Sequence, residues 1–137
     1  MTSKFKIRDA SGWTIFVFGL LALLFGLVSL IRPELLLSTL GFTVLDRSSR
    51  AAGDYTLVFA ITSAMASFNV GIYYMLASLN DLKQFYKWTV PFRCLTFVVF
   101  TMVVLTGLAP ARFFGVGAWE LTGALATGLA LWQENRK

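Results

Sequence analysis

The chain has 137 residues, of which 57% are hydrophobic and only 14% are charged, and its mean hydropathy is +0.71. Soluble domains are about one quarter charged, and a soluble protein of this size has too little interior to bury so much apolar surface. The composition therefore predicts one all-α integral membrane domain over residues 1–137. The net charge of +5 indicates Lys and Arg at helix ends. It does not indicate nucleic-acid binding, for which no basic face with interleaved aromatics is visible.

Missing residue types exclude several kinds of chemistry. The chain has no histidine and a single cysteine, Cys94. It therefore lacks the histidine ligands of haem, the His and Cys clusters of zinc sites and the cysteine pairs of thiol oxidoreductases. No second midplane carboxylate and no Ser-His or Cys-His arrangement accompanies Glu120. We therefore predict no metal and no cofactor, and these absences favour a non-enzymatic function without deciding the question.

Four apolar stretches are long enough to cross a bilayer, and we predict spans over about residues 12–31, 53–79, 89–108 and 113–132. The first span carries Gly12, Gly19 and Gly26 at intervals of seven residues, a stripe of small residues that lets another helix approach closely. In the connection after it, Pro33 suits the first turn of a helix and Gly41 a helix end. We therefore expect a short interfacial helix over 34–40.

The later spans differ in character. The second has a small packing face that includes Ala64 and Gly71, and a more polar face that includes Asn69 and Tyr73. Residues 80–88 are interpreted as a short basic connection with interfacial aromatics, which places Pro91 in the tolerant first turn of the third span.

The distribution of Lys and Arg predicts the orientation. The N-terminus, the second connection and the C-terminus together carry Lys4, Lys6, Arg8, Lys83, Lys87, Arg136 and Lys137, against Arg32, Arg47, Arg50 and Arg112 in the other two connections. Because positive residues are enriched on the cytoplasmic side, both termini are expected in the cytoplasm.

Two ionisable residues, Arg93 and Glu120, lie inside predicted spans, where a charge is costly unless it is paired, solvated or used. At ~1.5 Å per residue, Arg93 is ~6–8 Å from the cytoplasmic end of its span, whereas Glu120 and Asn69 are ~18 Å and ~15 Å from that side. Because arginine is long, these three residues and Tyr73 can form a buried polar cluster or a ligand-binding site inside the bundle.

Three interpretations of the embedded charges remain open. Arg93 can extend to the cytoplasmic headgroups without a partner. An Arg93–Glu120 pair can have a purely architectural role, or the Glu120 carboxyl can meet a ligand or a proton. Gly117, Gly123 and Ala124 on the face of Glu120 permit either a close helix approach or a cavity.

The order of several segments resembles small bacterial four-span proteins known mainly as a domain of unknown function and related to the DoxX-like group. The segments that carry the resemblance are a Pro-Glu-Leu-Leu and Leu-Gly stretch over 33–41, an acidic, Arg- and Gly-containing stretch over 46–53, and Arg93, Gly107, Pro110 and Glu120. The resemblance implies a four-helix bundle. By analogy with DoxX-like members, it also implies an association with quinone-linked respiratory complexes.

From these features we expect a non-catalytic membrane accessory or scaffold subunit, which assembles with a partner or with itself through its small-residue faces. The alternative is a protein that binds or carries an apolar small molecule, a lipid or a quinone, with Glu120 and Arg93 orienting its polar head. A third interpretation is an enzyme for hydrophobic substrates with Glu120 as acid or base. All three place the chain in a lipid bilayer, and the first predicts a homo-oligomer or a larger membrane complex.

Overall fold

The computed structural model describes residues 6–136, and these form helices and connections without a β-strand. In chain order the elements are α1 (Ala10–Ile31), α2 (Pro33–Thr39), η1 (Arg47–Ser49), α3 (Thr56–Leu79), α4 (Lys83–Leu105), η2 (Ala111–Phe113) and α5 (Phe114–Glu134). Within residues 6–136, four helical segments are long and apolar enough to cross a membrane. The predicted all-α membrane bundle of four helices is thus confirmed, and the short helix expected after the first span forms as α2. Lys4 and Lys137 lie outside the described residues.

Local signals explain where the first two helices begin and end. α1 begins after Asp9, whose carboxylate accepts a hydrogen bond from the Gly12 N–H at 2.9 Å. It ends at Ile31 because Pro33 disfavours helical backbone at the preceding Arg32; Pro33 then occupies the first turn of α2. Gly41 follows α2 with a φ of +85°, a conformation that glycine adopts without steric cost.

α4 begins earlier than predicted. It starts at Lys83 and not near residue 89, because the chain turns tightly before it at Asp81, which has a φ of 52°. The predicted basic connection is therefore mostly helix, and Pro91 lies inside α4 and not in its first turn. Arg93 is consequently about 15 Å from the start of its helix, deeper than expected.

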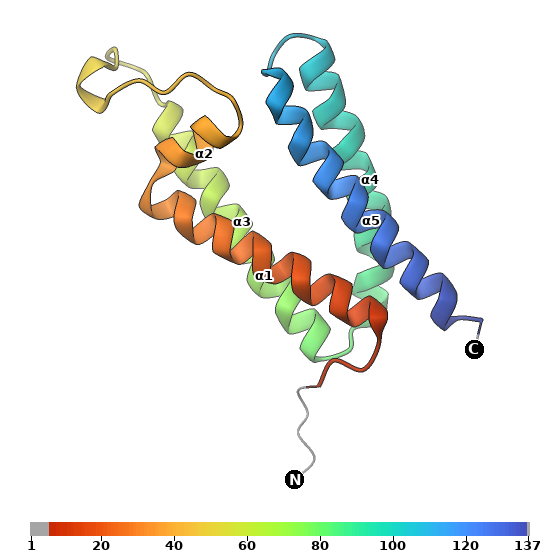
Figure 1. Cartoon of the computed structure of the whole chain (residues 1–137). Helices are drawn as coiled ribbons and strands as arrows, with labels where there is room; N and C mark the ends of the chain where they lie inside the picture. The colour runs from red at the N-terminus through yellow and green to blue at the C-terminus, as the bar shows by residue number, and fades with distance from the viewer. Residues whose placement is uncertain (1–5, 137) are drawn as a thin grey trace.

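The four long helices form two pairs, α1 with α3 and α4 with α5 (Figure 1). The first pair is held by close contact of small residues: a Cβ atom added to Gly26 would lie 2.6 Å from the backbone nitrogen of Phe68, and one added to Gly71 would lie 2.7 Å from the Gly19 carbonyl oxygen. Gly19 and Gly26 of the glycine stripe therefore do allow a close helix approach, and their partner is α3 of the same chain.

The two pairs diverge along their length (Figure 1). They converge at what we call the terminal end, where α1 begins, α3 turns into α4 and α5 ends. They separate toward the loop end, which carries α2, η1 and η2. The divergence leaves space between the pairs. The contacts that join the pairs at each end determine the shape of that space.

A polar cluster joins the pairs at the terminal end. The Lys83 ammonium donates to the Asp9 carboxylate, to the Ser11 hydroxyl at 2.8 Å and to the Glu134 carboxylate at 2.7 Å. Ser11 donates to Glu134 through its N–H at 2.8 Å and through its hydroxyl at 2.9 Å. This group of four residues, here the Lys83 cluster, connects the starts of α1 and α4 to the end of α5. It was not predicted, because its members lie in three distant parts of the sequence.

Acid is expected to weaken the Lys83 cluster through Asp9. Partial burial by itself raises the pKa of Asp9, but hydrogen bonds from Lys83, Gly12 and Ser11 outweigh it and hold the pKa below its ordinary value of 3.8. Because the pKa is lower in the folded state, the carboxylate contributes stability that is fully present above about pH 4. That contribution is lost as the pH falls through the folded-state pKa.

The variant Asp9→Asn keeps a side-chain acceptor but loses the charge. At about pH 7 it is expected to lower the free energy of unfolding by about 1.5–3 kcal/mol, the usual value of hydrogen bonds to a charged group. Thermal unfolding of the variant and the wild type between about pH 3 and about pH 7 checks this. A difference between the two proteins that does not shrink toward acid pH contradicts the expectation.

Candidate functional site

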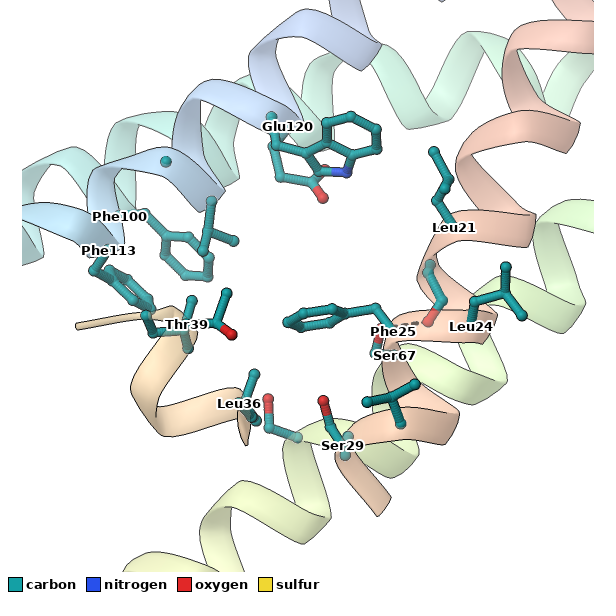
Figure 2. A pocket seen from close by; sticks show the side chains of 18 of the residues that line it. Leu21, Leu24, Phe25, Ser29, Leu36, Thr39, Ser67, Phe100, Phe113 and Glu120 are labelled. Carbon is teal, nitrogen blue, oxygen red and sulfur yellow. Dashed lines mark hydrogen bonds between the residues drawn. The ribbon is translucent and has the colours of Figure 1, made fainter. Parts of the chain in front are cut away.

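Between the diverging helix pairs lies a cleft of about 730 Å³, lined by residues of α1, α2 and α3 on one side and of α4, η2 and α5 on the other (Figure 2). Its lining is mostly leucine, phenylalanine and other apolar side chains. Apart from Trp119, whose indole carries one N–H, the lining residues with polar side chains are Ser29, Thr39, Ser63, Ser67, Arg112 and Glu120. The volume lies within the roughly 300–1,000 Å³ of small-molecule sites.

Side-chain contacts bridge the two helix pairs at each end of the cleft. Toward the terminal end, the Phe18 ring of α1 packs on the Trp119 ring of α5 with centroids 4.4 Å apart. At the loop end, the stem of Arg112 lies against Gly41, so closely that a Cβ atom on that glycine would be 2.8 Å from the Arg112 Cβ. The Phe42 and Phe113 rings, 6.1 Å apart, meet edge-on beside it. The cleft is thus bounded along the helix axes by contacts between the pairs.

Glu120 is the acidic residue of the cleft lining, and its carboxylate points toward the open space (Figure 2). It lies about 9 Å from the start of α5. Its Oε2 accepts a hydrogen bond from the Arg93 Nε at 2.8 Å, and the Glu120 side chain is 26% exposed against 5% for Arg93. The interpretation in which Arg93 extends alone to the headgroups is therefore wrong: the guanidinium is buried and paired at mid-helix.

Aromatic rings and a glycine shape the space around Arg93. Its guanidinium carbon lies 4.0 Å from the centroid of the Phe18 ring and 5.9 Å from that of Tyr74, which places a cation over aromatic faces. A Cβ atom on Gly123 would overlap the guanidinium, so α5 needs a glycine there. Among the described residues, the buried Nη1 has no hydrogen-bond partner. Arg93 is thus held mainly by stacking and by Glu120.

The structure does not bring the other two predicted site residues to this pair. Tyr73 is 60% exposed and lies on the outer surface of α3. Asn69 is half-buried, and no hydrogen bond links its side chain to Arg93 or Glu120. The polar cluster predicted from four residues is therefore a pair, Arg93 with Glu120.

The arrangement limits the chemistry that the cleft can perform. Within residues 6–136, no three His, Cys, Asp or Glu side chains gather as metal ligands. The lining offers one carboxylate, one guanidinium and several hydroxyls within an apolar wall. It can enclose an apolar molecule and accept a hydrogen bond from its polar group.

No protein family, no curated protein and no solved structure matches this chain. The resemblance to the DoxX-like group is not tested by these comparisons and stays a prediction. Function must therefore be argued from the cleft and from the Arg93–Glu120 pair.

Of the residues that surround Arg93, sequence reasoning missed Phe18 and Tyr74 but named Gly123. Gly123 carried a signal, because it follows Glu120 by one helical turn on the same face and leaves room for a large neighbour. Phe18 and Tyr74 carried none, since in a membrane span an aromatic residue that stacks on a cation has the same sequence pattern as one that faces lipid.

Proposed function

We propose that the protein binds an apolar small molecule, a lipid or a quinone, in the cleft. The observation that carries this proposal is the half-buried Glu120 carboxylate in the wall of a mostly apolar cleft of about 730 Å³. A charged group at this depth is costly and is typically retained for use. An apolar cleft with a few polar groups is also the usual form of a small-molecule site.

The scaffold hypothesis loses part of its support. It rested on small-residue faces that were free to meet a partner, but Gly19, Gly26 and Gly71 lie in the contact between α1 and α3. These glycines are therefore not available for a second protein. We place ligand binding first, and we keep assembly into a homo-oligomer or a larger membrane complex as a prediction.

We also propose that the terminal end faces the cytoplasm. Of the described basic residues, Lys6, Arg8, Lys83, Lys87 and Arg136 lie at that end, and Arg32, Arg47, Arg50 and Arg112 lie at the loop end. The excess supports the orientation expected from the positive-inside rule. In that orientation the cleft lies toward the non-cytoplasmic half of the membrane.

A pair of phenylalanine variants tests ligand binding. Ser63 and Thr62 are adjacent, exposed residues of α3, but only Ser63 is among the cleft-lining residues. Native mass spectrometry of the wild type is expected to show a stoichiometric lipid or quinone adduct. Ser63→Phe should weaken the affinity for that adduct about tenfold, a loss of about 1.4 kcal/mol, and so lower its occupancy, because the ring occupies the cleft. Thr62→Phe should leave the adduct unchanged.

Two results would count against the proposal. One is a protein that carries no adduct and takes up none of the lipids or quinones added to it. The other is an adduct that Ser63→Phe and Thr62→Phe affect equally, which would place the bound molecule on the outer surface. A stable oligomer without an adduct would restore the scaffold hypothesis to first place.

A further inference from the structure

The polar group that Glu120 presents to the cleft is a hydrogen-bond acceptor. An ionised carboxylate has acceptor atoms only. Its Oε2 already accepts from the Arg93 Nε at 2.8 Å, and no further hydrogen bond to this carboxylate is found within residues 6–136. The side chain is 26% exposed and points into the cleft (Figure 2). A ligand therefore meets an acceptor that has capacity for one more donor.

Arg93, the positively charged partner of Glu120, is buried and does not face the cleft. Arg93 is only 4% exposed, its guanidinium lies over the Phe18 ring, and it does not contribute to the cleft lining. A ligand in the cleft thus contacts the carboxylate of the ion pair but not the guanidinium. The charge of the pair is already balanced, so no further ion is needed to neutralise it.

We infer that the cleft selects lipids whose polar group is an uncharged hydroxyl, which donates to Glu120. This inference rests on the proposed function. An anionic head would set two acceptors of like charge against each other without a donor between them. An ammonium head would lose its hydration in an apolar cleft and would stand close to the Arg93 cation. A hydroxyl avoids both costs and supplies the donor.

One feature of the cleft favours a different ligand position. Arg112 lines the loop end of the cleft, about 12 Å from Glu120 along the helix axis. An anionic head placed there would leave the alkyl chain against Glu120, which would then have no donor besides the Arg93 Nε. We therefore assign the polar head to Glu120, and the alternative position becomes an outcome of the test.

Three amphiphiles with the same chain separate these possibilities: oleyl alcohol, oleate and oleylamine. Each is brominated across its double bond and compared at equal mole fraction in nanodiscs. Quenching of Trp119, which lines the cleft, is obtained as the difference between the wild type and Trp119→Phe. The alcohol is expected to bind about tenfold more tightly than the acid or the amine, as one hydrogen bond to a charged acceptor provides. The ranking is a property of the wild-type protein, and Trp119→Phe serves only to isolate the fluorescence of Trp119.

The variants then locate the head. Glu120→Gln adds an amide donor and is expected to remove the preference for the alcohol over the acid, whereas Glu120→Asp should keep it. One result would overturn the inference while leaving the proposed function intact: oleate binds as tightly as oleyl alcohol to the wild type, and Arg112→Gln abolishes the binding of oleate. Amine bound most tightly would also overturn it. If neither these amphiphiles nor added quinones bind in a manner that Ser63→Phe weakens, the proposed function itself fails.

Discussion

Replacing Gly71 with alanine is expected to lower the free energy of unfolding by about 3 kcal/mol or more. The added Cβ would lie 2.5 Å from the Leu23 nitrogen and 2.7 Å from the Gly19 oxygen. Both atoms belong to the α1 backbone, so a side-chain rotation cannot relieve the overlap. The helices must move apart, and the packing along the whole pair weakens. Thermal unfolding in detergent measures the loss.

Gly115→Ala is the matched control. Gly115 also lies in a long helix, but a Cβ atom there has no neighbour within 4 Å. Since alanine favours helix over glycine, this variant is expected to be neutral or to stabilise by about 0.5–1 kcal/mol. Equal effects of the two substitutions would show that the close approach of α1 and α3 does not hold the first helix pair together.

The sequence predicted the existence of the helices better than the contacts between them. Hydrophobic length alone located four spans, and the Gly19 and Gly26 stripe predicted a close helix approach. It could not predict the partner, because a small-residue face accepts a helix of the same chain or of another one. Assignment of the stripe to an external partner was therefore an assumption, and contact with Gly71 replaces it.

The predicted start of α4 is wrong because the residues before it are compatible both with an interfacial connection and with a helix. Lys83, Lys87 and the aromatic residues between them are typical of the interfacial ends of spans, yet they are also compatible with helix. The Lys83 contacts to Asp9 and Glu134 show why the helix continues through this region: its first residue is part of the Lys83 cluster. Contacts between residues so far apart in the chain leave no local pattern.

The candidate site was predictable only as a possibility. Depth along the helices made an Arg93–Glu120 pair feasible, and the structure contains it. The sequence places Tyr73 on the polar face of Asn69, but the rotation of α3 about its axis turns Tyr73 outward. The cleft depends on the divergence of the helix pairs (Figure 1), and divergence is set by bridging contacts that no periodicity reports.

Replacing Arg93 with methionine is expected to cost about 3–5 kcal/mol, the usual effect of removing one partner of a buried ion pair. The variant leaves the Glu120 carboxylate without its countercharge and removes the cation from the Phe18 ring. Arg47→Met is the matched control. That arginine also donates its Nε to a carboxylate, of Glu34, at 2.7 Å, but its side chain is 70% exposed. Because an exposed ion pair contributes little to stability, Arg47→Met is expected to leave thermal unfolding nearly unchanged.

The double variant Arg93→Met with Glu120→Met separates architecture from function. Because it leaves no unpaired charge, it is expected to recover most of the stability lost in Arg93→Met, measured by thermal unfolding in the same detergent. A pair with only a structural role would then be dispensable, and the double variant would still carry its apolar ligand with unchanged head-group preference. We expect instead a stable protein in which the preference for the alcohol over the acid is strongly reduced. Retained selectivity in that protein would show that Glu120 is not the group that recognises the ligand.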